Sequence, residues 1–201
     1  MLLDIVILPP RALGERLGKK VKEAVRGIPS IFAVDNKVLF LHLSLFHIKI
    51  SKQRLGLLSD KIKEIMQNYK PFGIRSLGSY VFKKGNWVSF ELAKSKTFMR
   101  LHKNIVLGSY RLRTGTMPFT SKRKMTKLER VYRKKYGTQH IFRLKKPHFT
   151  VAKFRSFEDA RKAARKLEPG KFSFSADVVA IAEVNFWHQV IKILKTFKLK
   201  K

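Results

Sequence analysis

Two short stretches dominate the interpretation of this sequence: residues 41–46 read LHLSLF, and residues 147–152 read PHFTVA. Both hold a histidine, an apolar residue, a hydroxyl residue and another apolar residue, as His42-Leu43-Ser44-Leu45 and His148-Phe149-Thr150-Val151. In a β-strand, positions i and i+2 lie on the same face of the sheet. Each stretch therefore predicts an imidazole beside a hydroxyl, with the apolar residues anchored in the core.

The pattern occurs at two of the six histidines in the chain. A single match is a weak signal, because a core histidine that is satisfied by a backbone partner explains it equally well. Two matches, 106 positions apart, are better explained by one functional element that occurs in two halves of the chain. The remaining histidines lack the pattern; they are His47, His102, His140 and His188.

The elements around these motifs alternate between strands and helices. Apolar periodicity and turn residues predict strands at 4–8, 37–46, 74–82, 87–92, 141–154, 172–184 and 190–199. Helices are predicted at 11–26, 52–69, 95–106, 120–136 and 156–167. This order predicts a single α+β domain over 1–201, in which two similar halves each pair strands with helices.

Charge is the strongest global signal in the composition. The 201 residues include 45 Lys and Arg against 13 Asp and Glu, a formal net charge of +32. Such an excess predicts a polyanionic partner, of which nucleic acid is the commonest. Residues 111–146 hold thirteen Lys and Arg and one acid, Glu129, and 120–136 predicts a basic helical arm. The arm's candidate RNA contacts are Lys122, Arg123, Lys124, Lys127, Arg130, Arg133, Lys134 and Lys135.

Other interpretations of the charge stay open. A solvated lysine-rich surface would account for it without any ligand. Binding to a membrane surface is less favoured, because 120–136 has only a thin apolar face. The chain lacks cysteine, which excludes disulfides and thiolate sites, and it has no apolar run of roughly 20 residues. We therefore expect a soluble cytoplasmic protein, and a monomer.

The two motifs and their surroundings resemble the two-histidine (2H) phosphoesterase superfamily, in particular the 2′-5′ RNA ligase-like proteins or RNA 2′,3′-cyclic phosphodiesterases. The resemblance extends over nearly the whole chain, from the first strand and its Pro9-Pro10 to Trp87–Leu92, residues 147–152 and the last strands. It implies a bilobal fold with pseudo-two-fold symmetry, in which two antiparallel sheets flank a central cleft and helices lie outside. Residues about 111–140 would be a basic insertion.

The resemblance also implies an activity. The enzyme would hydrolyse a 2′,3′-cyclic phosphate at an RNA end, with 2′-5′ ligation as a reverse reaction. The family's pattern assigns His42 as proton donor and His148 as proton acceptor. The chain departs from that pattern where it has Lys153 and Arg155 in place of an arginine after the second motif, and His47-Ile48-Lys49 after the first.

The chemistry of phosphodiester cleavage fits these residue types. A nucleophile must lose a proton while the leaving oxygen gains one, and imidazoles titrate near neutrality. Ser44 and Thr150 can donate hydrogen bonds to the non-bridging oxygens, and Lys153 or Arg155 can neutralise their charge. The sequence holds no H-E-x-x-H, no cysteine pair and no glycine-rich phosphate loop, so we expect neither a metal nor a cofactor.

Aromatic side chains could stack on the bases of a single-stranded substrate. The candidates are Phe46, Tyr80, Phe119 and Phe154. Two alternative functions remain: a non-catalytic basic RNA-binding protein on the same scaffold, and a 2H enzyme for a small nucleotide. The first predicts that replacing both motif histidines leaves RNA function intact, and the second predicts turnover that depends little on the basic arm.

Overall fold

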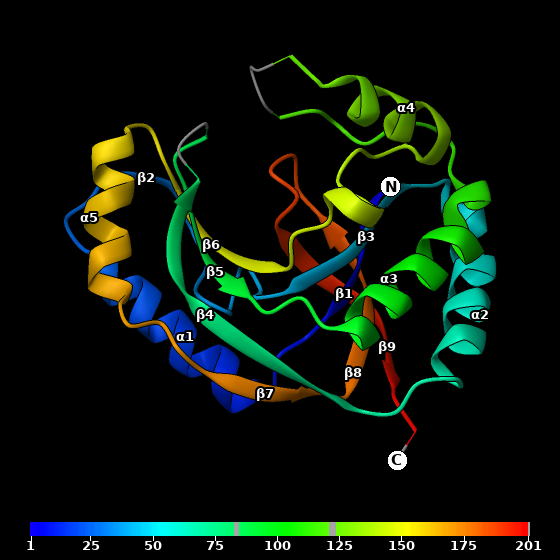
Figure 1. Ribbon diagram of the computed structural model, residues 1–201, viewed down its shortest axis with the longest axis horizontal. Helices are drawn as coiled ribbons and strands as arrows, with labels where there is room; N and C mark the ends of the chain where they lie inside the picture. The colour runs from blue at the N-terminus through cyan, green and yellow to red at the C-terminus, as the bar shows by residue number, and fades with distance from the viewer. Residues whose placement is uncertain (83–84, 121–123, 201) are drawn as a thin grey trace.

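The computed structural model describes residues 1–82, 85–120 and 124–200. Within them, strands and helices alternate along the chain (Figure 1). The strands are β1 (Leu2–Ile7), β2 (Ser30–Ala33), β3 (Leu43–Lys49), β4 (Phe72–Phe82), β5 (Trp87–Leu92), β6 (His148–Phe154), β7 (Ser173–Ala176), β8 (Val178–Val184) and β9 (Val190–Lys198). The helices are α1 (Arg11–Ala24), α2 (Leu55–Met66), α3 (Lys96–Ser109), α4 (Lys127–Tyr136) and α5 (Phe157–Leu167). The α+β class is confirmed.

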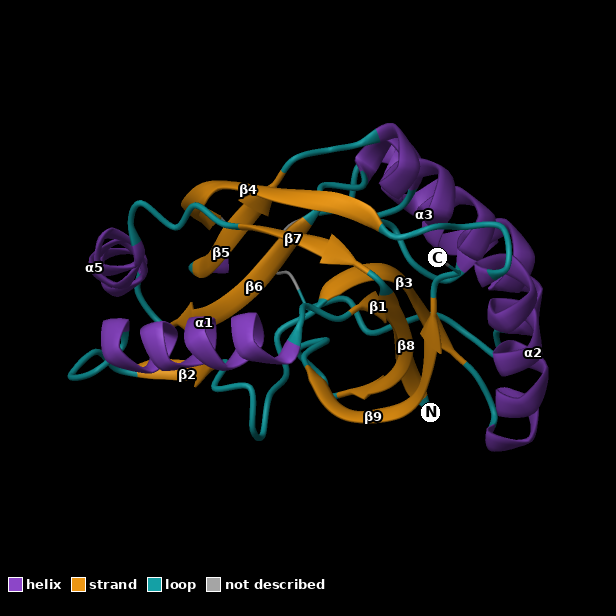
Figure 2. Ribbon diagram, turned by 90° about the horizontal axis from the view of Figure 1, so that it is seen from below, coloured by secondary structure: helices purple, strands orange, loops and turns teal. Residues whose placement is uncertain are grey.

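The strands form one antiparallel sheet in the order β7-β4-β5-β6-β3-β1-β8-β9, with β2 also paired to β6. The expectation of two separate sheets was therefore wrong. The two halves meet where β3 pairs with β6, and that junction consists of one residue pair, Leu43 opposite Phe149. Figure 2 shows β1, β3, β8 and β9 curling together on one side, with β4, β5 and β7 on the other. A single narrow junction keeps the sheet continuous while it allows the halves to diverge.

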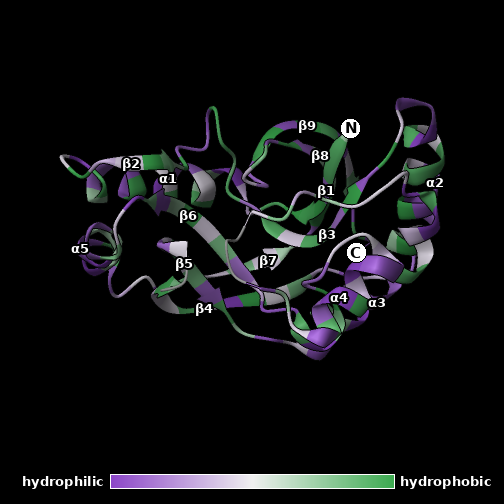
Figure 3. Cartoon of the chain, turned by 90° about the horizontal axis from the view of Figure 1, so that it is seen from above, coloured by the Kyte–Doolittle hydropathy of each residue, from purple (hydrophilic) through white to green (hydrophobic). Residues whose placement is uncertain are grey.

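Helices flank each half of the sheet. Helix α5 packs on α1, β4, β5 and β6, whereas α3 packs on α2 and β3. Figure 1 shows α1 and α5 at one side of the molecule and α2 and α3 at the other. These helices are amphipathic, and Figure 3 shows hydrophobic and hydrophilic residues alternating along α2. The main core takes buried residues from both halves, which include Leu45, Phe98, Phe149 and Leu167.

Three predicted strands differ from the structure. Residues 37–42 form a loop before β3, because the Asp35 carboxylate accepts the backbone N–H groups of Lys37, Val38 and Leu39. Residues 142–144 form a 3₁₀ turn, in which Phe142 has a φ of 51°. The predicted strand 172–184 is divided at Asp177 into β7 and β8. Strand β2 was not predicted; it has only four residues, of which two are exposed.

The basic segment contains a shorter helix than predicted. Helix α4 begins at Lys127, because Thr126 and Glu129 form a capping box, and it ends at Gly137, which has a φ of 83°. Lys122 and Arg123 of the predicted arm lie outside the described residues. The chain before α4 is anchored by Met117, which is buried in a second, small core with Val6 and residues of β8 and β9.

Candidate active site

The junction of β3 and β6 brings the two sequence motifs together. The antiparallel pair Leu43 and Phe149 sets His42 opposite Thr150 and Ser44 opposite His148. Leu43 and Phe149 are both buried in the main core. Their neighbours at i−1 and i+1 therefore project from the other face of the sheet. Two imidazoles and two hydroxyls form a square there, in which the histidines occupy one diagonal.

Diagonal positions on adjacent strands are about 7–8 Å apart. A phosphate between two such side chains can contact both rings. The two rings are also close enough to interact electrostatically, because the charge of a protonated His42 contributes to the low pKa of His148. The strand register therefore brings together two motifs whose proximity the family resemblance implied.

The two imidazoles are held in the same way. Nδ1 of His42 lies 2.8 Å from the carbonyl oxygen of Phe40, and Nδ1 of His148 lies 2.8 Å from that of Lys146. A carbonyl oxygen only accepts, so each Nδ1 carries a proton and donates it. In a neutral ring, Nε2 then holds the free lone pair. Both histidines thus reserve Nε2 for proton exchange with a substrate.

A β-bulge follows the hydroxyl residue of each motif. Leu45 is an extra residue in β3 relative to β1, and Val151 is an extra residue in β6 relative to β5. A bulge shifts the alternation of faces by one residue. The side chain at the sixth position of each motif therefore returns to the face of the histidine: His47 in the first motif and Lys153 in the second.

The first motif has a buried carboxylate that the sequence analysis missed. Asp4 of β1 is fully buried, and its Oδ2 accepts a 2.6 Å hydrogen bond from the Ser44 hydroxyl. The same oxygen lies 3.1 Å from Nε2 of His47 and 3.9 Å from Nε2 of His42. The only signal in the sequence was one acid within an otherwise apolar first strand.

This carboxylate limits what Ser44 can do. The Ser44 proton is already donated to Asp4, so a hydrogen bond from Ser44 to a phosphate would require that bond to break. Thr150 has no such partner among the described residues, and its hydroxyl remains the better placed of the two donors. Burial raises the pKa of Asp4, but the cations His47, His42 and Lys145 together outweigh this and lower the pKa to about 2.

The second motif has a buried cation instead. Lys145, three residues before His148, is only 6% exposed. No carboxylate of the described residues lies within 4 Å of its ammonium, and burial lowers its pKa to about 8. Its charge reaches both halves of the site, since it lowers the pKa of His42 as well as that of His148. A lysine within a run of basic residues carries no sequence signal of burial, and it was not predicted.

The two histidines consequently sit in unlike environments. Burial lowers the pKa of His42, while the Asp4 carboxylate opposes that shift. Burial lowers the pKa of His148 to about 4, and Lys145 adds to that shift. A proton is therefore favoured on His42 by a nearby negative charge and disfavoured on His148 by a nearby positive one.

The predicted phosphate ligands after the second motif differ in their contacts. Lys153 lies on the face of Thr150, but its ammonium donates to the Gly85 carbonyl at 2.8 Å and sits 4.3 Å from the Trp87 ring centre. It is 9% exposed and is thus largely committed to internal contacts. Arg155 is exposed, and its carbonyl oxygen accepts a hydrogen bond from the Asn86 side chain.

Two arginines of the predicted basic arm make hydrogen bonds within the protein. Arg130 donates to the Met125 carbonyl, and Arg133 donates to the Thr116 hydroxyl. Lys127, Lys134 and Lys135 are exposed on α4, and Lys124 is exposed just before it. These residues form a basic surface on α4, and their contact with RNA stays a prediction.

Two of the four predicted stacking rings are excluded. Phe46 and Phe154 are each 1% exposed and belong to the main core. Tyr80 and Phe119 are half-buried. Most phenylalanines of a small domain fill its core, and sequence alone does not separate those from rings at a surface.

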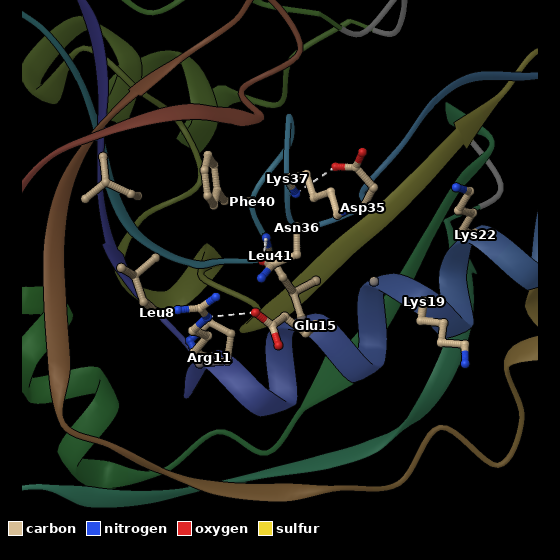
Figure 4. A pocket seen from close by; sticks show the side chains of 13 residues that line it. Leu8, Arg11, Glu15, Lys19, Lys22, Asp35, Asn36, Lys37, Phe40 and Leu41 are labelled. Carbon is tan, nitrogen blue, oxygen red and sulfur yellow. Dashed lines mark hydrogen bonds and ion pairs between the residues drawn. The ribbon is translucent and has the colours of Figure 1, made fainter.

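A pocket of about 820 Å³ lies beside the first motif (Figure 4). Its walls come from α1, with Arg11 and Lys19, and from the loop before β3, with Asp35 and Phe40. Figure 4 shows Arg11 paired with Glu15, and the Asp35 carboxylate turned toward its own loop. The pocket is lined by none of the predicted site residues, but the carbonyl of Phe40 orients His42.

The described residues contain no group of three or more His, Cys, Asp or Glu arranged to hold a metal ion. No helix in the same part of the chain is long and apolar enough to cross a membrane.

Comparison of the whole chain with known proteins gives matches in structure alone. No family model matches the sequence, and no curated protein matches it. The crystal structure of TT0787 of Thermus thermophilus is similar with a TM-score of 0.65 and 17% identity, covering 99% of this chain and 98% of that one. A crystal structure described as a phosphoesterase has a TM-score of 0.59 and 14% identity, over 100% and 99% of the two chains.

A third similar structure is E. coli LigT complexed with phosphate. Its TM-score is 0.58 and its identity 13%, over 99% of this chain and 97% of that one. The structural similarity covers the full length of each chain and shows a shared fold. The sequence identities are too low to show a shared chemistry.

Proposed function

We propose that this chain, which has the fold of the two-histidine phosphoesterases, is a phosphodiesterase that acts on RNA ends. Its substrate would be a 2′,3′-cyclic phosphate. The observation that carries the proposal is the matched pair of imidazoles, His42 and His148. They lie on one face of the sheet, and each Nδ1 donates to a carbonyl two residues earlier.

The geometry supports a general acid–base mechanism. His148 is the base: its Nε2 takes a proton from water as the water oxygen attacks phosphorus. The bond from phosphorus to one ribose oxygen then breaks, and His42 gives that oxygen a proton from its own Nε2. The products are a phosphomonoester and a free ribose hydroxyl, and exchange with solvent restores both rings.

The surroundings of the rings support these roles. A general acid must hold a proton until the leaving oxygen needs it, and the carboxylate of Asp4 favours that state of His42. A general base must be neutral, and burial with Lys145 nearby favours that state of His148. As negative charge grows on the non-bridging oxygens, the hydroxyl of Thr150 and the ammonium of Lys145 supply stabilisation.

RNA is proposed as the substrate because of the charge. The net charge of +32 and the basic surface on α4 suit a polyanion longer than one nucleotide. A small nucleotide needs no such surface.

The test is an assay in EDTA on an RNA that ends in a 2′,3′-cyclic phosphate. His42→Ala and His148→Ala should each lower the rate by about 10²–10⁴-fold. Gln67→Ala, which shortens an exposed side chain at the end of α2 outside both motifs, is the control. Full activity in either motif variant would refute the proposed roles.

A further inference from the structure

Four aromatic side chains form a continuous row beside the candidate active site. Phe32 of β2 contacts Trp87 of β5, Trp87 contacts Trp187, and Trp187 contacts Phe186. The successive ring centres are 5.5, 6.0 and 5.3 Å apart. Three of the rings are partly exposed, and Phe186 at the end of the row is 56% exposed. Rings that are adjacent and partly exposed form a continuous apolar patch, and such patches often mark a binding site.

A cation holds the middle of the row in place. The ammonium of Lys153 lies 4.3 Å from the ring centre of Trp87 and 5.0 Å from that of Trp187. It also donates a hydrogen bond to the Gly85 carbonyl. A cation over an aromatic face is attracted by the ring quadrupole, and here it joins two indoles from opposite halves of the sheet. The rings are thus held in place before any ligand binds.

Trp87, which Phe32 and Trp187 both contact, lies next to the motif face. Trp87 pairs with Lys153 and Ser89 pairs with Thr150 across β5 and β6. Residues two positions apart on a strand, such as Trp87 and Ser89, are separated by about 7 Å. The backbone of Trp87 therefore lies about one nucleotide length from Thr150. From there the row leads outward to Phe186.

The loop that carries the outer rings is itself well defined. The side-chain oxygen of Asn185 accepts the backbone N–H groups of Trp187 and Gln189. His188 of the same loop packs against His47, with ring centres 4.7 Å apart. The loop therefore contacts the sixth residue of both motifs, His47 through His188 and Lys153 through Trp187.

We propose that this aromatic row is a stacking platform for the unpaired bases of a single-stranded RNA. Every base presents a π-face, so stacking on aromatic side chains binds a strand without selecting its sequence. The strongly basic chain provides the complementary charge for the phosphates between those bases. A mononucleotide could occupy only the inner end of the row, and the exposed ring of Phe186 favours a longer strand. The direction of that strand relative to the motifs rests on the proposed function.

The chain is well suited to a direct test, because its two tryptophans are both in the row. Intrinsic fluorescence of the His148→Ala variant would be titrated with a single-stranded oligoribonucleotide that ends in a 3′-phosphate. We expect quenching, and we expect it in Trp87→Phe and Trp187→Phe as well, since each leaves one reporter. Phe186→Ala should weaken binding by roughly 5- to 150-fold.

The matched control is Leu57→Ala, which shortens an exposed apolar side chain on α2 and should leave the affinity unchanged. Equal affinity for RNA in Phe186→Ala and its parent would overturn the platform, as would equal affinity for a mononucleotide and an oligonucleotide. If binding depends on Phe186 but no cyclic phosphate is hydrolysed, the platform stands and the proposed function fails. If cyclic phosphate is hydrolysed but RNA binding does not depend on Phe186, the proposed function stands and the platform fails.

Discussion

The two halves of the candidate active site share one backbone plan and differ in charge. Each has a histidine whose Nδ1 donates to the carbonyl two residues earlier, a hydroxyl at i+2 and a β-bulge directly after it. The first half places a buried carboxylate, Asp4, next to its histidine. The second places a buried ammonium, Lys145, near its own. A repeated scaffold can therefore serve two opposite proton-transfer roles, because the charges around it differ.

The largest expected effect separates the two roles. Leaving groups of low pKa depart without a proton, so an aryl phosphodiester needs the base and has little need of the acid. On such a substrate we expect His148→Ala to lose about 10²–10⁴-fold in kcat/KM, and His42→Ala to lose less than about tenfold. The comparison with the cyclic phosphate of RNA is the control. A larger loss in His42→Ala on the aryl substrate would show that the assignment is reversed.

Replacement of the buried cation should affect activity and stability in opposite directions. Lys145→Met removes a charge that would stabilise the phosphate, so we expect activity to fall by about 10–10³-fold. It also removes an ammonium whose burial is costly, so the melting temperature should rise by about 2–4 °C per kcal/mol gained. Lys146→Met, at an exposed neighbour, should change neither. A loss of both activity and stability would contradict this account.

The same lysine gives a pH dependence with a definite sign. Its pKa in the folded protein is about 8, below the ordinary value of 10.5, so the unfolded chain binds more protons between these values. Stability should therefore rise with pH across that window in the wild type. In Lys145→Met this rise should be smaller, which denaturant titrations at about pH 8 and about pH 10 would measure.

The carboxylate of the first half predicts a smaller effect. Asp4→Asn removes the negative charge that opposes the burial-induced fall in the pKa of His42. The pKa of His42 should fall further, and the alkaline limb of the pH–rate profile should move to lower pH. The limb that reports His148 should move less. Asp177→Asn, at an exposed acid, is the control, and an unchanged alkaline limb would refute the role of Asp4.

The smallest effect concerns the basic surface on α4. Neutralising Lys127, Lys134 and Lys135 should reduce the slope of log K against log salt by roughly 0.7 for each phosphate of a single strand that the variant no longer neutralises. Replacement of three exposed basic residues elsewhere, Lys63, Lys70 and Lys198, controls for net charge alone. Equal slopes in the two triple variants would exclude α4 from the RNA-binding surface.

The sequence predicts the two motifs of the site better than it predicts the residues packed around them. The apolar residues Leu43 and Phe149 point into the core, as the period-two pattern predicted, because local alternation determines which face a residue occupies. That the two motifs meet on adjacent strands was implied only by the family resemblance. Asp4 and Lys145 were missed because burial of a charge depends on the pairing of distant strands. The bulges at Leu45 and Val151 have no local sequence signature. The sequence therefore did not predict that His47 and Lys153 lie on the same face as the motif histidines.

The mispredicted elements of the fold have the same origin. Residues 37–42 have strand composition, but the Asp35 carboxylate binds their N–H groups and produces a loop. Tertiary contacts also hold the segment before the second motif: His102 donates to the Leu45 carbonyl and accepts from the Phe142 N–H. One buried histidine thus joins the β3 motif strand to the turn before β6. Propensity does not encode a link of this kind.

The central claim is that His42 and His148 converge on one phosphate, and imidazole ¹⁵N NMR during a titration with inorganic phosphate tests it most directly. The account predicts that the Nε2 resonances of both rings shift together, with one Kd, while the Nδ1 resonances keep the signature of a carbonyl-bound N–H. It also predicts that the pKa of both rings rises when the anion binds. A shift confined to one ring, or two different Kd values, would contradict it.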